Sequence, residues 1–511
     1  MATSLMILSG CSMLEPQPLT VDEIDNLAEQ ARNESHTDVK PIHGVLTQQE
    51  AIARAVKYNL SWRIHMMEEA LSHNQLDMSR YDMLPKLTAS AGYTSRNNYH
   101  LTSAVDSVTG EPSLANPFIS TDREHTTTGL ELTWNTLDFG VSYYNAKQQA
   151  DRLLIASEKR RKAMHTLIQD VNTAYWRAAS AQALKPMITE AIEMAEDALA
   201  KSRREQAEQL HGAEESLRYQ RQLLENLRLL EIINKELISA KVELAHLINA
   251  PVGEEIKLAE MKFDLPQNIL DQPLAQLEQT AIENNPEIRQ KIYDTRIAAI
   301  EAKKTLLKVF PRLNLNFGSQ RDDDRYLVNN SWREAGGLLS FNLFDLFSLQ
   351  TRQKFANAGV TLSKQKMMAT LMAVIAKVHI ARLDYEGAQR QFKRADEVWQ
   401  VDDQLRQHTS NAVKLQTQGR LQLVAQRTIA VLSLLRRYQA YADAQAAAAR
   451  LQASLGLEPK ISSVHDTSLS QLIKEVEMGC NQWQEGILPA TTDNELTTSE
   501  VSTKPAVSMQ R

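Results

Sequence analysis

The spacing of apolar residues along the chain changes between two periods. Around residues 87–93 and 130–134, apolar residues alternate with polar or small ones. The same alternation returns at 313–317 and 339–343. A period of two is typical of a strand with one buried face, so four short strands are expected.

Helices are expected on both sides of each strand pair. A short helix is predicted around residues 21–32, and Thr47 with Glu50 forms the signature of a capping box before a longer one. In such a box the Thr hydroxyl and the Glu carboxylate both bind free amides at the helix start. The helix should reach about Met83, because Pro85 lacks an amide hydrogen and disfavours helix before it.

Two much longer helical stretches follow the strands. The first runs from about Val141 to Asn249, with Pro186, which should kink or break it, and Gly212 as its only breakers. No proline occurs between 311 and 459. Helices of about 60 residues would reach roughly 90 Å. Apolar residues spaced by three and four form coiled-coil seams; these are Leu223, Leu227, Leu230, Leu237 and Leu244, then Val374, Val378, Ala381, Tyr385, Ala388, Phe392 and Ala395.

Distinctive residues of the first half recur in the second at fixed offsets. The offset is 226 positions before the strands and 207 after them, so the first strand-to-strand loop is 19 residues longer. Such a register predicts a tandem duplication. The matched pairs are Asn59 and Asn285, Pro85 and Pro311, Asn135 and Asn342, Asp138 and Asp345, and Gly212 and Gly419.

The chain is therefore expected to divide into six parts. These are a truncated lipoprotein signal (1–11), a linker with a short helix (12–45), the first repeat (46–250), an inter-repeat linker (251–272), the second repeat (273–458) and a flexible C-terminal tail (459–511). The tail is polar, rich in Ser and Thr, and holds Cys480.

The start of the chain resembles a bacterial lipobox. Leu-Ser-Gly-Cys at 8–11 follows a short apolar core, and the thiol of such a cysteine is acylated after signal cleavage. A covalent lipid on Cys11 is expected, and Ser12 favours the outer membrane; a chance cysteine in a start peptide is the alternative. The signal is expected to be truncated, because no basic residue precedes its apolar core.

Composition narrows the possible functions. The formal net charge of -6 argues against a nucleic-acid protein, which usually has a basic face. With two cysteines there is no disulfide framework. No run of about 18 apolar residues follows the N-terminus, so an ordinary spanning helix is not expected.

The sequence shows no catalytic or metal-binding pattern. The 12 histidines show no paired metal spacing, and no phosphate-binding glycine loop occurs, so neither a cofactor nor a metal is expected. Asp322, Asp323 and Asp324 suggest a cation site, but a solvated loop is the simpler interpretation. The 16 methionines are scattered, which is typical of core filling rather than of copper export.

Four strands in one chain pose a closure problem. A membrane barrel has about eight strands or more, and open strand edges cannot face lipid because unpaired amides cost several kcal/mol each. The strands either lie outside a membrane or are shared between chains. Three chains would supply 12 strands, with the long helices continuing as a coiled-coil cylinder.

The motifs around these elements occur twice in the same order. The first copy reads AIARAVKYN at 51–59, LPKL at 84–87 and WNTLDFG at 134–140. The second reads AIENNP at 281–286, FPRL at 310–313 and FNLFD at 341–345. Over about 46–457 this order resembles the outer-membrane efflux (TolC) family, in its lipoprotein-type form.

The resemblance implies a mainly α fold with a membrane β-barrel part. Three tandem-repeat protomers would form a 12-stranded barrel in the outer membrane of a Gram-negative bacterium, continued by an α-helical barrel in the periplasm. The partners implied are two further copies of the chain, a periplasmic adaptor, an inner-membrane pump and outer-membrane lipid, without nucleic acid.

The resemblance also implies specific tip residues. Gly212 and Gly419 would lie at the distal helix turns, where a positive φ is tolerated in glycine. The neighbouring adaptor contacts would be His211, Ala213, Gln418 and Arg420. At the periplasmic constriction the family commonly has acids six and nine positions after the second glycine. This sequence has Ala425 and Thr428 there, and Arg218 in the first half, so no acidic ring is expected at these positions.

The expected function is a duct of a tripartite efflux or type I secretion system rather than an enzyme. Its energy would come from the inner-membrane partner, and its gate would lie at the helical tips. A periplasmic or membrane-attached coiled-coil scaffold is the alternative, but it leaves the alternating segments unexplained. A lipoprotein enzyme would need a catalytic constellation that the sequence does not show.

Overall fold

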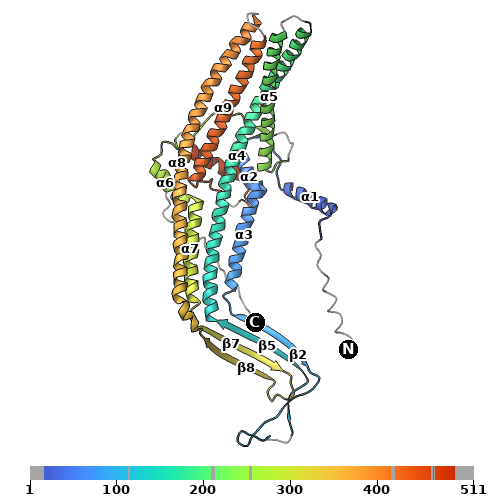
Figure 1. The fold of residues 1–511 in the computed structure, drawn as a ribbon, viewed down its shortest axis with the longest axis vertical. Helices are drawn as coiled ribbons and strands as arrows, with labels where there is room; N and C mark the ends of the chain where they lie inside the picture. Colours follow the sequence, from blue (N-terminus) through green and yellow to red (C-terminus); the bar gives the residue numbers. More distant parts are fainter. Residues whose placement is uncertain are drawn as a thin grey trace, which may run out of the picture.

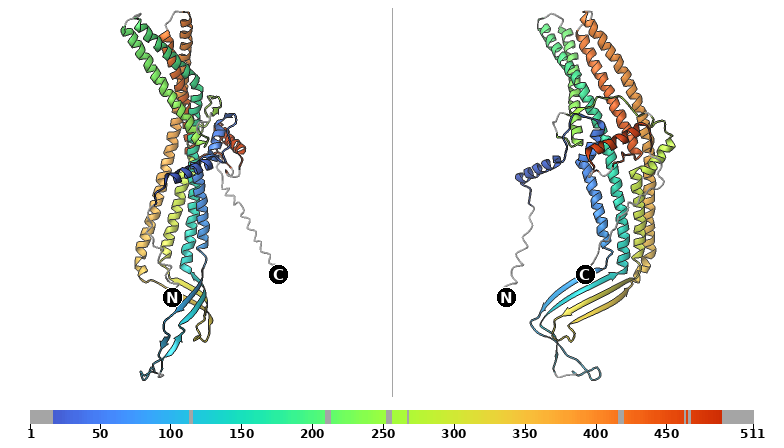
Figure 2. Two further views of the ribbon diagram at one scale, coloured as in Figure 1. Left: turned by 90° about the vertical axis from the view of Figure 1, so that its right-hand side faces the viewer. Right: turned by 180° about the vertical axis from the view of Figure 1, so that it is seen from behind.

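A strand-rich end and a bundle of long helices form an elongated molecule (Figure 1). The computed structural model describes residues 17–112, 116–208, 213–251, 256–266, 268–415, 420–461, 464 and 467–488. The sheet lies at one end, the free ends of two helix pairs lie at the other, and small elements surround the middle (Figures 1 and 2).

Four antiparallel strands form the sheet, as the alternation predicted. In spatial order they are β2 (Lys86–Ser95), β5 (Glu124–Asn135), β7 (Arg312–Asp322) and β8 (Ser331–Ser340). The prediction for the last strand was wrong in position, because Asn342 accepts the amide of Phe344 at 3.2 Å and so belongs to a helix start. The longer first loop carries an additional hairpin, β3 (His100–Thr102) and β4 (Phe118–Thr121).

Six helices run along the molecule. They are α3 (Leu60–Tyr81), α4 (Thr136–Ala207), α5 (Ala213–Leu247), α7 (Pro286–Leu307), α8 (Phe344–Lys414) and α9 (Arg420–Ser454). Next to the sheet, α3 and α7 flank α4, and α7 packs on α8; in the distal half, α4 pairs with α5 and α8 with α9 (Figure 1).

The two longest helices exceed the expected length. With 72 and 71 residues, α4 and α8 extend about 105 Å at a rise of about 1.5 Å per residue. α4 begins directly after the strand, where Asn135 caps it by accepting the amides of Leu137 and Asp138. Pro186 lies within α4 without ending it, so the helix break considered for this position does not occur.

Asn59 divides the helix that was expected to run without interruption to Met83. Its extended backbone (φ -63°, ψ 123°) separates α2 (Gln48–Tyr58) from α3. The predicted capping box before α2 is also incomplete. Thr47 accepts the Glu50 amide at 3.2 Å, but the Glu50 carboxylate binds Arg54 at 2.8 Å instead of returning to the cap.

The two halves use matching residues in matching roles, which confirms the duplication. Asn59 Nδ2 donates to the Leu247 carbonyl at 2.9 Å, and Asn285 Nδ2 donates to the Ser454 carbonyl at 3.0 Å. Each asparagine also caps the helix that follows it. The acceptor positions differ by the 207 residues found in the sequence.

Short elements form an equatorial belt around the middle of the long helices (Figure 2). They are α2, α6 (Leu274–Asn284), α10 (Leu469–Gln484) and the parallel strands β1 (Val45–Leu46) and β6 (Lys257–Leu258). The short N-terminal helix, α1 (Val21–His36), is four residues longer than predicted. It projects from the molecule at the level of the belt (Figure 1). The belt's core joins α2, α4, α5, α9 and α10.

The prediction of a flexible tail after residue 459 was wrong for α10. Leu472 and Val476 of this helix are fully buried, and Trp483 belongs to a second core cluster that includes Val374 and Tyr385. Cys480 lies against the belt core, and burial raises the pKa of its thiol to about 11. The segment after residue 459 is polar in overall composition, so the single apolar face of α10 was not recognised in the sequence.

Candidate functional site

The two faces of the sheet differ in chemistry. Side chains alternate across a strand, and the register places most apolar positions of the four strands on one face, whereas Trp332 and Leu338 of β8 lie on the other. That apolar face comprises Leu87, Ala89, Ala91, Tyr93, Leu130, Leu132, Trp134, Leu313, Leu315, Phe317, Ala335 and Leu339. The opposite, polar face carries mostly Thr, Ser, Asn, Gln, Glu and Gly.

Two carboxylates lie in one row of the polar face. Glu131 is the cross-strand partner of Gly318, and Gly318 is the partner of Glu334. Both Glu side chains are exposed in the single chain. Because Gly318 has no side chain, the two carboxylates flank an open position. Lys86 and Arg312 occupy the same face closer to the helices.

Each strand also places one glycine on the polar face, and these form a diagonal row. They are Gly92, Gly129, Gly318 and Gly336. A Cβ at Gly92 would meet Thr127 Oγ1 at 2.9 Å, and one at Gly318 would meet Glu334 Cγ at 3.4 Å. Glycines of this kind let a sheet curve. Because these glycines have no side chains on the polar face, that face is less crowded. The sheet can therefore curve with its polar face on the inside.

Among the described residues, no further strand pairs with either lateral edge of the sheet. β2 and β8 are the outer strands of the sheet. Beside β2, α3 and α5 expose apolar residues along one side: Leu60, Ile64, Met67, Leu71 and Met78, then Leu217, Leu224, Ile238 and Val242. Beside β8, α8 exposes Phe355, Leu362, Met372, Ile380, Leu383, Val398, Val401 and Leu405.

These exposed stripes have helical periodicity and lie opposite the packed sides. On α8, Val374, Val378 and Tyr385 are fully buried on the other side of the helix. Apolar patches of this length on a single chain mark surfaces that another protein covers. Sequence reasoning located the packed seam but not the second, exposed stripe.

Most of the predicted tip residues cannot be placed. Cys11, His211, Gly212, Gln418 and Gly419 lie outside the residues that the structure describes. Ala213 and Arg420 are the first residues of α5 and α9, and α4 and α8 end at Ala207 and Lys414. Long helices thus end and restart on either side of each predicted turn.

The three predicted constriction residues differ in environment. Arg218 forms a 2.6 Å ion pair with Glu214 one turn away, and both side chains are 80% exposed. Ala425 is half-buried. Thr428 is 2% exposed, and its hydroxyl donates to the Val424 carbonyl at 2.9 Å, so its side chain faces the helix packing. Ala425 and Thr428 lie one turn apart on α9, and Arg218 lies on α5.

An ion pair joins the two distal helix hairpins. Arg427 of α9 binds Glu190 of α4, and the same guanidinium contacts Met194 Sδ at 2.7 Å. The Arg427 side chain is 24% exposed, whereas that of Glu190 is 63% exposed. Sequence analysis missed this pair, because nothing in the sequence indicates a contact between residues 237 positions apart.

A buried charged cluster fastens the end of the second repeat to α4. The Arg161 guanidinium binds Glu458 at 2.6 Å and Glu158 at 2.7 Å. His165 Nε2 lies 2.5 Å from the other Glu458 oxygen. Burial would raise the pKa of Glu458, but hydrogen bonds from His165 and Arg161 outweigh it and lower that pKa.

The carboxylates of Asp322, Asp323 and Asp324 contact groups of β5 and of the following turn. Asp322 lies 2.8 Å from His125 Nδ1, Asp323 accepts the Thr126 amide at 2.5 Å, and Asp324 accepts the Tyr326 amide at 3.0 Å. Among the described residues, no group of three or more His, Cys, Asp or Glu side chains is arranged to hold a metal ion.

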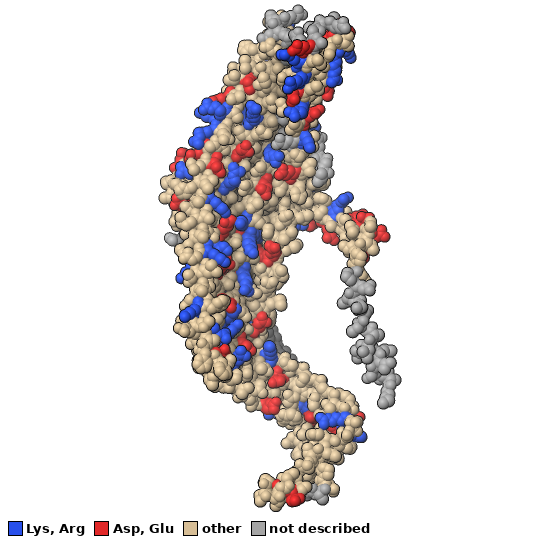
Figure 3. Space-filling model, in the orientation of Figure 1, with Lys and Arg blue, Asp and Glu red and all other residues tan. Residues whose placement is uncertain are grey.

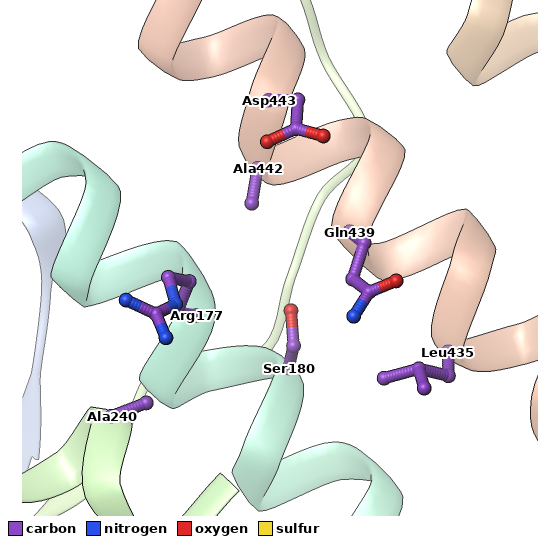
Figure 4. A pocket seen from close by; sticks show the side chains of 7 residues that line it. All are labelled: Arg177, Ser180, Ala240, Leu435, Gln439, Ala442 and Asp443. Atoms are coloured by element: carbon purple, nitrogen blue, oxygen red, sulfur yellow. The ribbon is translucent and has the colours of Figure 1, made fainter. Parts of the chain in front are cut away.

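A cavity of about 230 Å³ lies between α4, α5 and α9 (Figure 4). Its lining residues are Arg177, Ser180, Ala240, Leu435, Gln439, Ala442 and Asp443. Burial raises the pKa of Asp443, against the opposing effect of Arg450 and Arg177. Arg177 pairs with Glu243 at 2.9 Å, so the cavity lies at a junction of helices with paired charges at its edge.

None of the described helices combines the length and the apolar character needed to cross a membrane.

Comparisons with known proteins agree with the resemblance found in the sequence. Residues 65–250 match the family model described as outer membrane efflux protein. No curated protein sequence matches the chain.

Solved structures with a similar fold cover most of the chain. The CmeC outer membrane channel of Campylobacter jejuni has a TM-score of 0.64 at 12% identity, covering 92% of this chain and 94% of its own. The open-state MtrE outer membrane channel of Neisseria gonorrhoeae has a TM-score of 0.62 at 15% identity, covering 80% of this chain and 88% of its own. The outer membrane protein VceC of Vibrio cholerae has a TM-score of 0.59 at 13% identity, covering 80% of this chain and 96% of its own. Residues 65–250 are thus similar to the outer membrane efflux protein family, and the fold over most of the chain is similar to that of solved outer membrane channels.

Proposed function

We propose that the chain is one protomer of a homotrimeric channel through the outer membrane that carries exported compounds. The observation that carries this proposal is the pair of free lateral flanks, which are apolar along the helices and unpaired along the sheet. The family match and the fold shared with outer-membrane channels support the outer membrane as the location.

The two flanks differ, so they fit a ring rather than a face-to-face dimer. The flank with β2, α3 and α5 on one protomer would meet the flank with β8 and α8 on the next. A contact between two different surfaces forms a closed ring when its rotation closes. Three protomers bring 12 strands together, which pairs every outer strand and removes the open edges.

The polar face of the sheet fits the inside of this ring. In a membrane barrel, apolar side chains face lipid and polar ones line the interior. The apolar face, with Trp134, Phe317 and Leu339, would then contact lipid. The glycine row would let the sheet curve around the interior. The result is a water-filled path that needs no catalytic group.

The distal helix ends are the proposed docking and gating region. The Gly212 and Gly419 turns, with His211, Ala213, Gln418 and Arg420, would contact a periplasmic adaptor that leads to an inner-membrane pump. The pump would supply the energy, and separation of the two hairpins would open the path. A lipid on Cys11 would add a second membrane attachment.

The deciding experiment measures the mass and shape of the detergent-extracted protein by light scattering and negative-stain imaging. A trimer longer than about 100 Å is expected, since α4 alone extends about 105 Å. Ile64→Glu with Leu71→Glu should convert the trimer to monomer, because it places charges on the exposed α3 stripe. Ser72→Glu lies on another side of α3 and should leave the trimer intact. A monomeric or dimeric wild-type protein would instead favour the coiled-coil scaffold.

A further inference from the structure

In the part of the chain that the structure describes, the apolar side of helix α1 is left uncovered. None of its residues is buried, and Val21, Ile24 and Leu27 are 73%, 49% and 56% exposed. In the described structure it is held mainly at its C-terminal end, where Asn249 Nδ2 donates to the Ser35 carbonyl at 2.7 Å. Its sequence is nevertheless strongly helical, with a complete capping box between Thr20 and Glu23.

The apolar residues of α1 share one side. Ile24, Leu27, Ala28 and Ala31 follow the spacing of three, four and seven that defines a helix face. Burying such a face stabilises a helix of this length, which is marginal by itself in water. A capped, amphipathic but uncovered helix therefore indicates a surface that is missing from the single chain.

The direction of α1 indicates where that surface lies. It leaves the body at the level of the equatorial belt and projects beyond the flank formed by α3 and α5 (Figure 1). In the proposed ring this flank meets α8 of the next protomer. α1 therefore extends over the space that a second copy of the chain would occupy.

The charges of the two surfaces are complementary. Residues 21–36 contain five Asp or Glu against one Arg, and the acidic side chains of α1 are visible in Figure 3. Residues 361–394 of α8 contain seven Lys or Arg against two Asp or Glu. Lys364, Lys366 and Arg390 among them are exposed.

A membrane surface fits α1 less well. Helices that lie on bilayers carry Lys and Arg on their polar face and bind anionic lipids through them. The acidic polar face of α1 would be repelled by such a surface. The charge balance thus favours a basic protein surface over lipid.

We propose that α1 is an inter-protomer clasp that docks its apolar face on the α8 side of the neighbouring copy of this chain, at the level of the equatorial belt. The clasp rests on the proposed trimer. It would lie outside the contact between α3, α5 and α8 and would hold adjacent protomers together after those helices have met.

Site-specific photocrosslinking in the full-length protein tests this clasp. A benzophenone amino acid at Leu27 should crosslink to a second chain after illumination of membranes, and mass spectrometry should map the crosslink to residues 361–394. The same probe at Asn26, on the opposite side of α1, is the matched control and should give only background. Asp22→Lys with Asp25→Lys should reduce the Leu27 crosslink to that background.

The mass of the protein is measured in parallel, so that the two proposals can fail separately. A crosslink within the same chain, to lipid or to another protein, or none at all, overturns the clasp if the trimer is intact. Loss of the trimer itself in the unmodified protein would overturn the proposed function and the clasp together. Removal of residues 17–36 should leave trimers that dissociate at lower temperature than the full chain.

Discussion

At Gly456 the backbone after α9 turns with φ +74°. A Cβ there would lie 2.5 Å from the carbonyl carbon of Asn284, in the backbone that leads to Asn285. The matching position of the first repeat is Asn249, whose φ is +53°. Asparagine tolerates this left-handed conformation where most residues do not. Both repeats thus end their second long helix with the same reversal.

Gly456→Ala should destabilise the protein by about 1–3 kcal/mol, since it adds a strained φ and a backbone clash. Gly359→Ala is the matched control, because that glycine lies within α8 with open space around its Cα. It should stabilise the helix by about 0.5–1 kcal/mol. Thermal unfolding of both variants, followed by circular dichroism, measures the difference, and equal shifts would contradict the argument.

The Glu458 cluster gives a pH dependence whose sign follows from its environment. The pKa of Glu458 is lowered in the folded protein, so its contribution to stability is present above its ordinary pKa of 4.5. That contribution is lost as pH falls through the lower, folded pKa. Between pH 7 and 3, wild type should therefore lose thermal stability more steeply than Glu458→Gln.

The control for this pH profile is Glu214→Gln. Glu214 pairs with Arg218 at a position where both side chains are 80% exposed, so removing this pair should leave the profile of wild type unchanged. Parallel profiles for wild type and Glu458→Gln would show that the buried cluster does not couple to folding.

At the scale of elements, how well each was predicted depends on how local its cause is. The strands follow from alternation within ten residues, and the long helices follow from seams and the absence of proline. The break at Asn59 was missed because its buried side chain binds the distant Leu247 carbonyl. α10 was missed because its few apolar residues matter only once the belt core is present.

The polar face of the sheet allows a prediction about conduction. Glu131 and Glu334 share one row, so three protomers would place six carboxylates in one zone of the interior, spread along its axis by the tilt of the strands. A ring of acids attracts cations into a pore. Replacing both residues with Gln should lower the cation preference of the reconstituted channel, measured as a smaller reversal potential in a salt gradient.

Glu111→Gln is the comparison for this measurement. Glu111 is exposed in the loop between β3 and β4, outside the sheet, so its loss should leave the reversal potential near that of wild type. If the double Gln variant also kept the wild-type value, the polar face would not line the conducting path.

At the scale of the whole molecule, the described structure leaves strand edges and apolar helix surfaces uncovered. Its sheet has two unpaired edges and its helices have two uncovered stripes, while the packed seams lie between them. The seams could be predicted from the sequence because the chain itself covers them. The stripes could not be separated from the seams, since burial by a second chain leaves the same apolar spacing.

The distal half has few described polar links between its two hairpins, and the Glu190–Arg427 pair is one of them. Opening at the tips by separation of α4 and α5 from α8 and α9 would have to break this pair. Its partly buried guanidinium makes it stronger than a fully exposed pair, which contributes at most about 1 kcal/mol. Loss of about 1 kcal/mol from the closed state would raise the open population roughly fivefold.

Arg427→Ala should accordingly increase the fraction of time that single channels conduct in planar bilayers, by roughly fivefold on this estimate. Arg228→Ala removes an arginine from an exposed pair within a single helix, so it should leave the open fraction unchanged. Charge reversal at both partners, Glu190→Arg with Arg427→Glu, should restore the closed state, which distinguishes the ion pair from general loosening of the tips. An unchanged open fraction in Arg427→Ala would mean that the hairpins are held closed by contacts between protomers instead.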